Sequence, residues 1–286
     1  MDFTERRRTL RRLLDQASAP ILVPGCHDAL SARQVEAAGF PLVYIGSYAT
    51  SASRLGLADA GVADLTETVE HARSVVSSVQ IPVLADAENG FHHAANIWRT
   101  IHAFEHAGIS GIHIEDHEFG KHTDAAFVLL DQDQMAQKIR AAVDARRDPN
   151  FLIIARTDCY WAWQDANEVV KRLNAYLEAG ADMVFPSGIP ANELAKIRSQ
   201  IKGKVMITNQ AGQSLADEDA AGVNVSLYYG FTLYAAFQGV KDALDQLKNT
   251  QQDRSVVNLG TDVQAFEEFM NYTGFVDRAK TYGLVK

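Results

Sequence analysis

The stretch AGISGIHIED, residues 107–116, decides the fold of this chain because its pattern recurs along the sequence. In each copy Ala-Gly ends a segment of helical composition, and a strand-like apolar run follows. Glycine at this point is typical of a helix end, and a nearly continuous apolar run is typical of a strand buried in a parallel sheet. The other copies are AGFPLVYIGS (38–47), AGADMVFPSG (179–188) and AGVNVSLYYG (221–230). The pattern predicts repeated units of a helix followed by a parallel strand.

Further apolar runs complete a set of eight candidate strands. They are ILVPGC (21–26), PVLADAE (82–88), FLIIART (151–157) and KVMITNQ (204–210), with segments of helical composition between them. Eight such units in about 230 residues predict an α/β fold, a (β/α)8 TIM barrel over residues 1–250. An open doubly wound sheet is the alternative, but it more often has a glycine-rich turn after its first strand, and this sequence has none there.

The C-terminal part of the chain predicts a helical extension. The stretch TLYAAFQGVKDALDQLKN (232–249) leads into a tail, residues 251–286, that carries more aromatic side chains than a free tail requires. We expect these side chains to pack either on the barrel of the same chain or on a partner subunit. They are Phe266, Phe269, Tyr272 and Phe275.

Composition narrows the class of protein. Hydrophobic residues make up 47% of the chain, enough for a sizeable core, and a net charge of -9 argues against nucleic acid or an anionic membrane as a partner. No apolar run approaches the roughly 20 residues of a membrane span, and the N-terminus lacks the features of a signal peptide. We therefore expect a cytoplasmic protein with neither kind of partner.

Two smaller features have ordinary interpretations. Cys26 and Cys159 lack the spacing of a metal site and are expected to be buried, reduced thiols. Arginines gather in an amphipathic N-terminal stretch, which is interpreted as a solvated helix face. They are Arg6, Arg7, Arg8, Arg11 and Arg12.

Acidic residues gather where the predicted strands end. Asp86 and Glu88 follow the third strand and Glu115 the fourth, on the face where barrel enzymes carry their active sites. Carboxylates on one rim repel one another unless a cation is bound, and without a His/Cys cluster they favour a hard ion such as Mg2+. Two alternatives stay open. Asp86 and Glu88 cap the next helix, or two acids form a glycosidase pair with Trp161 and Trp163 near the sugar.

Two other polar residues interrupt apolar strands. Arg156 ends the fifth strand, where a buried guanidinium needs an anionic partner. That partner is either a carboxylate such as Glu115 or a carboxylate of the substrate. His113 lies one layer below the rim and is interpreted as a core histidine rather than a catalytic one.

Taken together, the strand ends resemble those of a known family. The chain is similar to the isocitrate lyase and phosphoenolpyruvate mutase superfamily from about residue 20 to residue 250. The most specific part is the ordered set of Asp86, Glu88, Glu115, Lys121 and Arg156. The similar segments are YIGSYATSASRLGLADAG (44–61), LADAENGF (84–91), GIHIEDHEFGKHTD (111–124), KIRAAVDARRDPNFLIIARTD (138–158) and AGADMVFPSG (179–188).

The resemblance implies a metal-dependent enzyme. The family binds Mg2+ or Mn2+ through acids after the third and fourth strands, which implies Asp86, Glu88 and Glu115 as ligands, with Asp59 nearby; Glu88 replaces an aspartate of the family. Its substrates are 2-oxo or 2-hydroxy acids that chelate the metal, with a carboxylate held by backbone amides. The implied substrate-binding residues are Tyr44, Gly46, Ser47, Tyr48, Asp86, Arg156 and Asn209. The family also exchanges its eighth helix between subunits, which implies a homodimer or homotetramer with a swapped C-terminal helix.

The segment after the fourth strand distinguishes branches of the family. Lys121 matches a lysine in a loop that closes over the site. The isocitrate-type lyases have a cysteine, their general acid, where this chain has Thr123, and a glutamate where it has Ser187. FGKHTD (119–124) most resembles the oxaloacetate decarboxylase branch. The implied catalytic residues are Lys121, His122, Thr123 and Arg156.

The leading hypothesis is a Mg2+-dependent lyase that cleaves a carbon–carbon bond of a small 2-oxo or 2-hydroxy dicarboxylate through a metal-stabilised enolate. Its most concrete form is decarboxylation of oxaloacetate to pyruvate, because departing CO2 needs no general acid and His122 or a water can protonate the enolate. Alternatives in the family are cleavage of methylisocitrate or an alkylmalate, and hydrolysis or transfer at the P–C bond of phosphonopyruvate. From a different class, the chain is a non-catalytic barrel that binds metabolites.

Overall fold

The computed structural model describes residues 2–118, 128–250 and 260–284. By its internal contacts the chain divides into two compact units, Met1–Leu233 and Tyr234–Lys286. The first unit contains all eight strands and the candidate site. Each unit is therefore described by itself.

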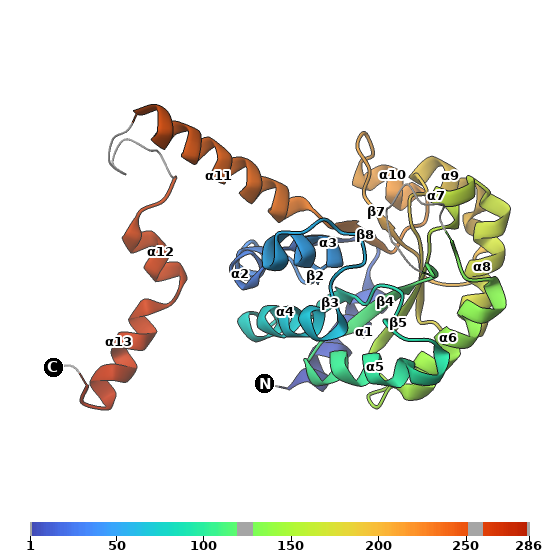
Figure 1. The fold of residues 1–286 in the computed structure, drawn as a ribbon, viewed down its shortest axis with the longest axis horizontal. Coiled ribbons are helices and arrows are strands. Elements are labelled where there is room, and N and C mark those ends of the chain that lie inside the picture. Colours follow the sequence, from blue (N-terminus) through green and yellow to red (C-terminus); the bar gives the residue numbers. More distant parts are fainter. Residues whose placement is uncertain (1, 119–127, 251–259, 285–286) are drawn as a thin grey trace. The chain divides into compact units, whose positions relative to one another are not determined.

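The first unit is a barrel of parallel strands in the order β6-β5-β4-β3-β2-β1-β8-β7 (Figure 1). A parallel bridge between Val184 and Val205 brings the two end strands together. Sequential neighbours pair throughout, as expected when each strand is followed by a helix that returns the chain. The strands are β1 Ile21–Cys26, β2 Val43–Ile45, β3 Val83–Asp86, β4 Gly111–Glu115, β5 Leu152–Thr157, β6 Met183–Pro186, β7 Met206–Thr208 and β8 Val225–Tyr228.

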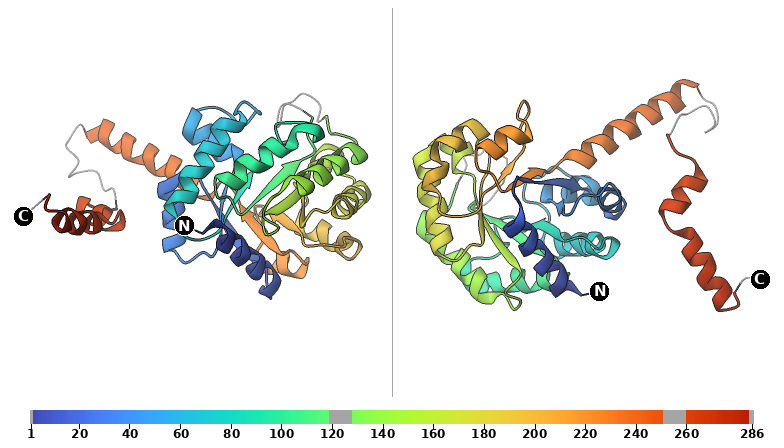
Figure 2. Two further views of the ribbon diagram at one scale, coloured as in Figure 1. Left: turned by 90° about the horizontal axis from the view of Figure 1, so that it is seen from below. Right: turned by 180° about the vertical axis from the view of Figure 1, so that it is seen from behind.

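Helices lie around the outside of the strands (Figure 2). Together with the strands they confirm the predicted (β/α)8 TIM barrel. The helices of this unit are α1 Phe3–Gln16, α2 Ala29–Ala37, α3 Ser47–Thr50, α4 Leu65–Ser78, α5 Ile97–His106, α6 Gln132–Ala145, α7 Cys159–Trp163, α8 Ala166–Glu178, α9 Ala191–Ile197 and α10 Leu215–Ala220. Short helical turns occur at Ser51–Leu55, Ala94–Asn96 and Arg198–Gln200.

The side chains of each strand alternate between the inside and the outside of the barrel. In β5, Leu152 and Ile154 belong to the inner apolar cluster, whereas Ile153 and Ala155 pack outward against the helices. This period of two carries on into the polar end of the strand, so Arg156 lies on the inner side. Because side chains alternate along each strand, polar side chains at inward-facing positions after the apolar part of a strand lie inside the barrel, at its C-terminal end.

Helix α1 closes the opposite end of the barrel and corrects one expectation from the sequence. Arg6 and Arg7 are buried, not solvated. Arg6 donates to the carbonyl oxygens of Val76 and Val79 at the end of α4, and Arg7 donates to that of Glu105 at the end of α5. Carbonyls at a helix end lack partners within the helix and carry partial negative charge, so a guanidinium is stabilising there. A sequence pattern of charged residues does not show which of them have such partners.

The ion pair between Arg7 and Asp148 predicts a loss of stability in Arg7→Met. The two side chains are 3.0 Å apart and mostly buried, and breaking a buried pair destabilises a protein by about 3–5 kcal/mol. Arg12→Met, which removes an exposed pair with Glu5, is the control and should change the free energy of unfolding by less than about 1 kcal/mol. Urea unfolding measures both, and equal losses in the two variants would show that Arg7 has no such role.

Because the pKa of Asp148 is lowered, the loss of stability in Arg7→Met should depend on pH. Burial alone would raise that pKa, but hydrogen bonds from Asn150, Arg7 and Thr4 outweigh burial and hold it at about 2, below its usual 3.8. A carboxylate with a lowered pKa stabilises the fold above the pKa of the unfolded chain and loses that contribution as the pH falls. The difference in the free energy of unfolding between wild type and Arg7→Met should therefore become smaller as the pH falls from 3.8 towards 2.

The second unit consists of helices. Helix α11, Phe231–Thr250, begins at the end of the first unit, and α12 Val263–Phe269 and α13 Tyr272–Thr281 follow. Its exposed large apolar side chains include Phe237, Phe266 and Phe275. Exchange of this segment between subunits stays a prediction, as does the domain boundary at residue 250. Within the ranges that the structure describes, no helix is both long and apolar enough to cross a membrane.

Candidate active site

Polar side chains from several strands meet in one cavity at the C-terminal end of the barrel. The cavity has a volume of about 700 Å3. Every residue that the sequence assigns to substrate binding lines it, and so does Asp59. These residues are Tyr44, Gly46, Ser47, Tyr48, Asp86, Arg156 and Asn209.

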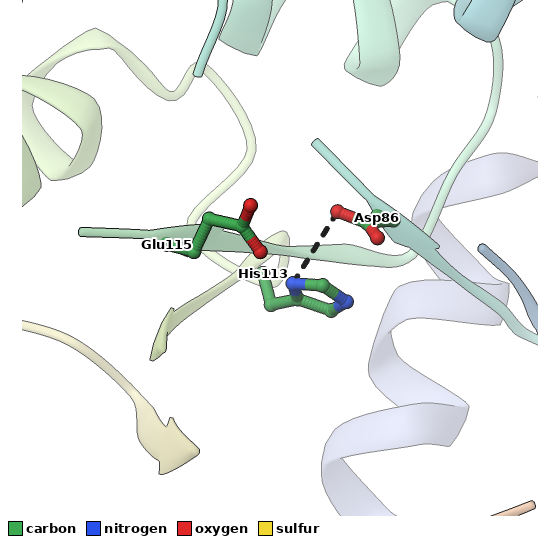
Figure 3. Close-up of side chains that lie close together, drawn as sticks. All are labelled: Asp86, His113 and Glu115. Atoms are coloured by element: carbon green, nitrogen blue, oxygen red, sulfur yellow. Dashed lines mark ion pairs between the residues drawn. The ribbon is translucent and has the colours of Figure 1, made fainter. Parts of the chain in front are cut away.

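Two carboxylates and an imidazole lie closest together at the inner wall. Asp86, His113 and Glu115 each offer one atom, and these three atoms lie within 4.8 Å of one another. Figure 3 shows His113 pointing towards Asp86, with its Nδ1 3.6 Å from Oδ1, and the carboxylate of Glu115 on the same side. All three side chains are buried. They are on neighbouring strands, Asp86 on β3 and the other two on β4, so the sheet itself fixes their spacing.

Hydrogen bonds orient Asp86. It accepts one from the hydroxyl of Ser47 at 2.8 Å and one from the backbone N–H of Glu88, also at 2.8 Å. The hydroxyl oxygen of Ser47 also lies 3.4 Å from Oδ2 of Asp59. The end of β2 therefore positions the acid at the end of β3.

The backbone at Glu88 connects the two acids. Glu88 adopts a φ of 51°, in the left-handed region that non-glycine residues seldom occupy, at a conformational cost of about 1–3 kcal/mol. In this conformation its N–H donates to Asp86 and its C=O accepts from the N–H of Glu115 at 2.9 Å. The strained turn therefore holds the ends of β3 and β4 in a fixed register.

This group fits a divalent metal ion by the chemistry of its donors. Carboxylate oxygens are the ligands that Mg2+ and Mn2+ prefer, and a cation would relieve the repulsion between Asp86 and Glu115. His113, interpreted from the sequence as a core histidine, borders the same group. Its Nε2 is hydrogen-bonded to the hydroxyl of Tyr44 at 2.9 Å, which holds the ring in place. Glu88 and Asp59, implied as ligands by resemblance, lie outside this closest group.

Arg156 has the anionic partner that its position predicted, and a second one as well. One guanidinium nitrogen lies 3.0 Å from Glu115, and two others donate to Asp158 at 2.7 and 2.8 Å. Burial alone would lower the pKa of Arg156, but the charges of Asp158 and Glu115 outweigh burial and raise it well above its usual value. The guanidinium also lies 5.3 Å over the ring of Phe185. It is therefore a permanent and rigidly held cation.

Asp158 extends this pairing to the end of β4. Its second oxygen lies 2.8 Å from Nε2 of His117. Burial alone would raise the pKa of Asp158, but the charge of Arg156 and the hydrogen bonds from His117 and Arg156 outweigh burial and lower it. Glu115, Arg156, Asp158 and His117 form what we call the inner ion-pair network. Lys121, His122 and Thr123, the remaining candidate catalytic residues, lie outside the described residues.

A second set of contacts fixes the same two strands from outside. Asp116 accepts hydrogen bonds from Thr157 at 2.6 Å, Arg172 at 2.9 Å and Tyr176 at 3.0 Å. Its pKa is raised by burial, which the hydrogen bond from Thr157 only partly offsets. Because side chains alternate along a strand, Glu115 faces the inside of the barrel, beside Asp86 and Arg156, and Asp116 faces α8.

The sequence pointed to Glu115, but not to Asp158, as the partner of Arg156. A signal was available, because residues two apart on a strand lie on the same side, and Asp158 follows Arg156 by two positions. His117 follows Glu115 in the same way. The period of two, continued past the strand ends, would have grouped all four members of the inner ion-pair network.

Comparisons with known proteins agree with this geometry. The family model described as phosphoenolpyruvate phosphomutase matches residues 10–248. A 2,3-dimethylmalate lyase of Eubacterium barkeri is 34% identical over 260 residues, which cover 87% of this chain and 89% of that protein. These matches span nearly the whole barrel.

Solved structures agree as well. The crystal structure of a phosphoenolpyruvate phosphomutase from Streptomyces platensis subsp. rosaceus is 28% identical and has a TM-score of 0.90, over 96% of this chain and 99% of that one. A phosphonopyruvate hydrolase in complex with oxalate and Mg2+ is 27% identical and has a TM-score of 0.88, over 97% and 99% of the two chains. Since the family model covers most of the chain and the lyase covers most of both proteins, this protein belongs to the phosphoenolpyruvate phosphomutase family, within the isocitrate lyase and phosphoenolpyruvate mutase superfamily.

Proposed function

We propose that this protein is a Mg2+-dependent lyase that cleaves a carbon–carbon bond of a small 2-oxo or 2-hydroxy dicarboxylate. The observation that carries the proposal is that Asp86 and Arg156 line one cavity, and that the buried Glu115 lies next to both of them. Acids that suit a hard cation and a fixed guanidinium are what a chelating, anionic substrate requires. The relatives are lyases, hydrolases and mutases of one superfamily, which supports the same class of chemistry.

Each group has a role in this proposal. Asp86 and Glu115, with Glu88 and Asp59 nearby, hold the metal, which supplies positive charge next to the substrate oxygens where negative charge develops. Arg156 binds a substrate carboxylate through N–H groups of its two terminal nitrogens that Asp158 and Glu115 do not use, and its orientation is already fixed by Asp158. Backbone amides at Gly46, Ser47 and Tyr48 hold the other carboxylate.

Decarboxylation of oxaloacetate is the simplest form of this reaction. The bond between C3 and the departing carboxylate breaks, its electron pair moves into an enolate of pyruvate, and a proton is added at C3. The departing CO2 needs no general acid, so the reaction suits a chain with Thr123 where isocitrate-type lyases have a cysteine. Lys121 is proposed to stabilise the developing charge and His122 or a water to supply the proton.

Cleavage of a substituted malate is the second candidate. It is favoured by the 2,3-dimethylmalate lyase relative and by a cavity of about 700 Å3, which exceeds the needs of a four-carbon acid. In this reaction the C2 hydroxyl gives up its proton to a base, the C2–C3 bond breaks, and C2 becomes the carbonyl carbon of a 2-oxo acid. The electron pair of the broken bond goes to C3, which takes up a proton. The same metal ligands and the same arginine serve both reactions.

An assay for release of a 2-oxo acid tests the proposal. Purified protein with Mg2+ should release pyruvate from oxaloacetate, or a 2-oxo acid from an alkylmalate, well above the background of the metal alone. Lys121→Ala should abolish turnover and keep the affinity for oxalate, because the lysine acts on developing charge and not on the chelating oxygens. Activity on phosphonopyruvate alone would replace this proposal with P–C bond chemistry. Oxalate binding without turnover of any substrate would identify a binding protein.

A further inference from the structure

The cavity is larger than a four-carbon dicarboxylate requires, and aromatic side chains line it. The volume of the whole cavity, about 700 Å3, equals that of roughly twenty water molecules at about 30 Å3 each. We infer that the substrate carries an extended apolar group on C3, alkyl or aryl, and that this group lies between Trp161 and the pair of Tyr48 and Tyr229. The inference rests on the proposed function for the 2-oxo or 2-hydroxy acid to which the group is attached.

One wall of the mouth is an aromatic pair. Tyr48 follows β2 and Tyr229 follows β8, and their rings meet edge to face with centroids 5.6 Å apart. Both line the cavity, and each keeps 38% of its surface exposed. Aromatic surface at the mouth of a cavity is stabilised when an apolar ligand removes it from water. The pair therefore offers a flat apolar face and edge to a substrate.

Trp161 forms the opposite wall. Trp161 lies in α7, which follows β5, and β5 is on the opposite side of the barrel from β1. The two tyrosines follow β2 and β8, the strands on either side of β1. The indole of Trp161 is 46% exposed. Gly188 fixes its place, because a Cβ on Gly188 would lie 1.5 Å from the indole ring, and the φ of Gly188 is +78°. The glycine lets the indole lie directly on the turn after β6, so this wall is built into the fold.

The aromatic lining of the mouth selects against a further carboxylate on the substrate. Among the lining residues that the structure describes, Arg156 is the one cation, and it already faces Glu115 and Asp158. A carboxylate on the C3 substituent would lie against the rings of Trp161, Tyr48 and Tyr229, and an unpaired charge moved out of water is strongly unfavourable. An uncharged apolar substituent avoids this penalty.

A graded series of ligands tests the inference. Malate, 3-methylmalate, 3-propylmalate and 3-benzylmalate are titrated calorimetrically with Mg2+ present, and release of 2-oxo acid is measured in parallel. Affinity should rise about fourfold for each methylene group, the ratio that corresponds to about 0.8 kcal/mol per buried CH2. Methylisocitrate, whose substituent carries a carboxylate, should bind more weakly than 3-propylmalate. A flat series, or tighter binding of methylisocitrate than of 3-benzylmalate, overturns the inference.

Matched variants locate the effect. Trp161→Ala should lower the affinity for 3-benzylmalate about tenfold. It should leave the affinity for oxalate unchanged, since oxalate lacks a substituent. Trp98→Ala is the control, because Trp98 is 50% exposed on α5 and does not line this cavity. Equal responses of the two variants would contradict the inference. If affinity rises along the series but no member is cleaved, the inference holds and the proposed lyase activity is wrong. If members are cleaved but affinity does not rise, the lyase activity holds and the inference is wrong.

Discussion

Arg156→Lys is expected to lower kcat/KM by about 10²- to 10³-fold on any substrate that the protein turns over. Lysine keeps the charge, but a single ammonium cannot reach Glu115 and also pair with both oxygens of Asp158, as the guanidinium does. The cation that remains is mobile, and loss of one fixed donor at a reacting anion has an effect of this size. Steady-state kinetics measure the change, and binding of oxalate provides a readout that does not depend on turnover.

Arg172→Lys is the matched control for this variant. Arg172 and Arg156 have side chains of similar burial, 5% and 8% exposed, and both pair with a carboxylate at the ends of β4 and β5. Arg172, however, contacts Asp116 on the outer side of the strands and does not line the cavity. Both variants should lose stability in thermal unfolding, but Arg172→Lys should keep kcat/KM within about threefold of the wild type. If the two lower it equally, Arg156 acts only through the fold.

The barrel was predictable because its signal is local and repeated. Each Ala-Gly step before an apolar run reports a helix end and the start of a strand without reference to the rest of the chain. The rim followed from the same reasoning, because the polar residue after each apolar run must lie at the C-terminal end of its strand. Asp86 and Arg156 were found in this way, and the resemblance supplied roles for them.

The sequence did not show which groups the buried arginines and His113 contact. The pattern predicted a charged face for Arg6 and Arg7, yet they donate to carbonyl oxygens of α4 and α5 that are far away in the sequence. His113 read as a core residue, and only the pairing of β3 with β4 brings its ring beside Asp86. Partners of this kind depend on which helix ends and strand ends become neighbours, so composition and periodicity of one segment do not specify them.

Asp86→Asn and Glu115→Gln are expected to weaken Mn2+ binding by more than about 100-fold. Each substitution keeps the shape of the side chain and removes the negative charge that a hard divalent cation requires. The expected loss exceeds the 10- to 100-fold effect typical of groups that only orient a ligand, because these two carboxylates lie in the closest donor group. Titration of Mn2+ followed by electron paramagnetic resonance measures the affinity without any substrate, so the result does not depend on which acid the protein cleaves.

Asp116→Asn is the control, because it removes a buried carboxylate at the end of the same strand but outside the group of candidate metal ligands. Asp116 is the next residue after Glu115 and is equally buried, but its carboxylate faces α8 and accepts from Thr157, Arg172 and Tyr176. The variant should lower the free energy of unfolding by a few kcal/mol, because it weakens a buried ion pair, and leave the Mn2+ affinity unchanged. Retention of Mn2+ binding in Asp86→Asn and Glu115→Gln, at the level of this control, would mean that the metal binds elsewhere. Loss in those two alone would place the ion between β3 and β4, where Asp86 and Glu115 meet.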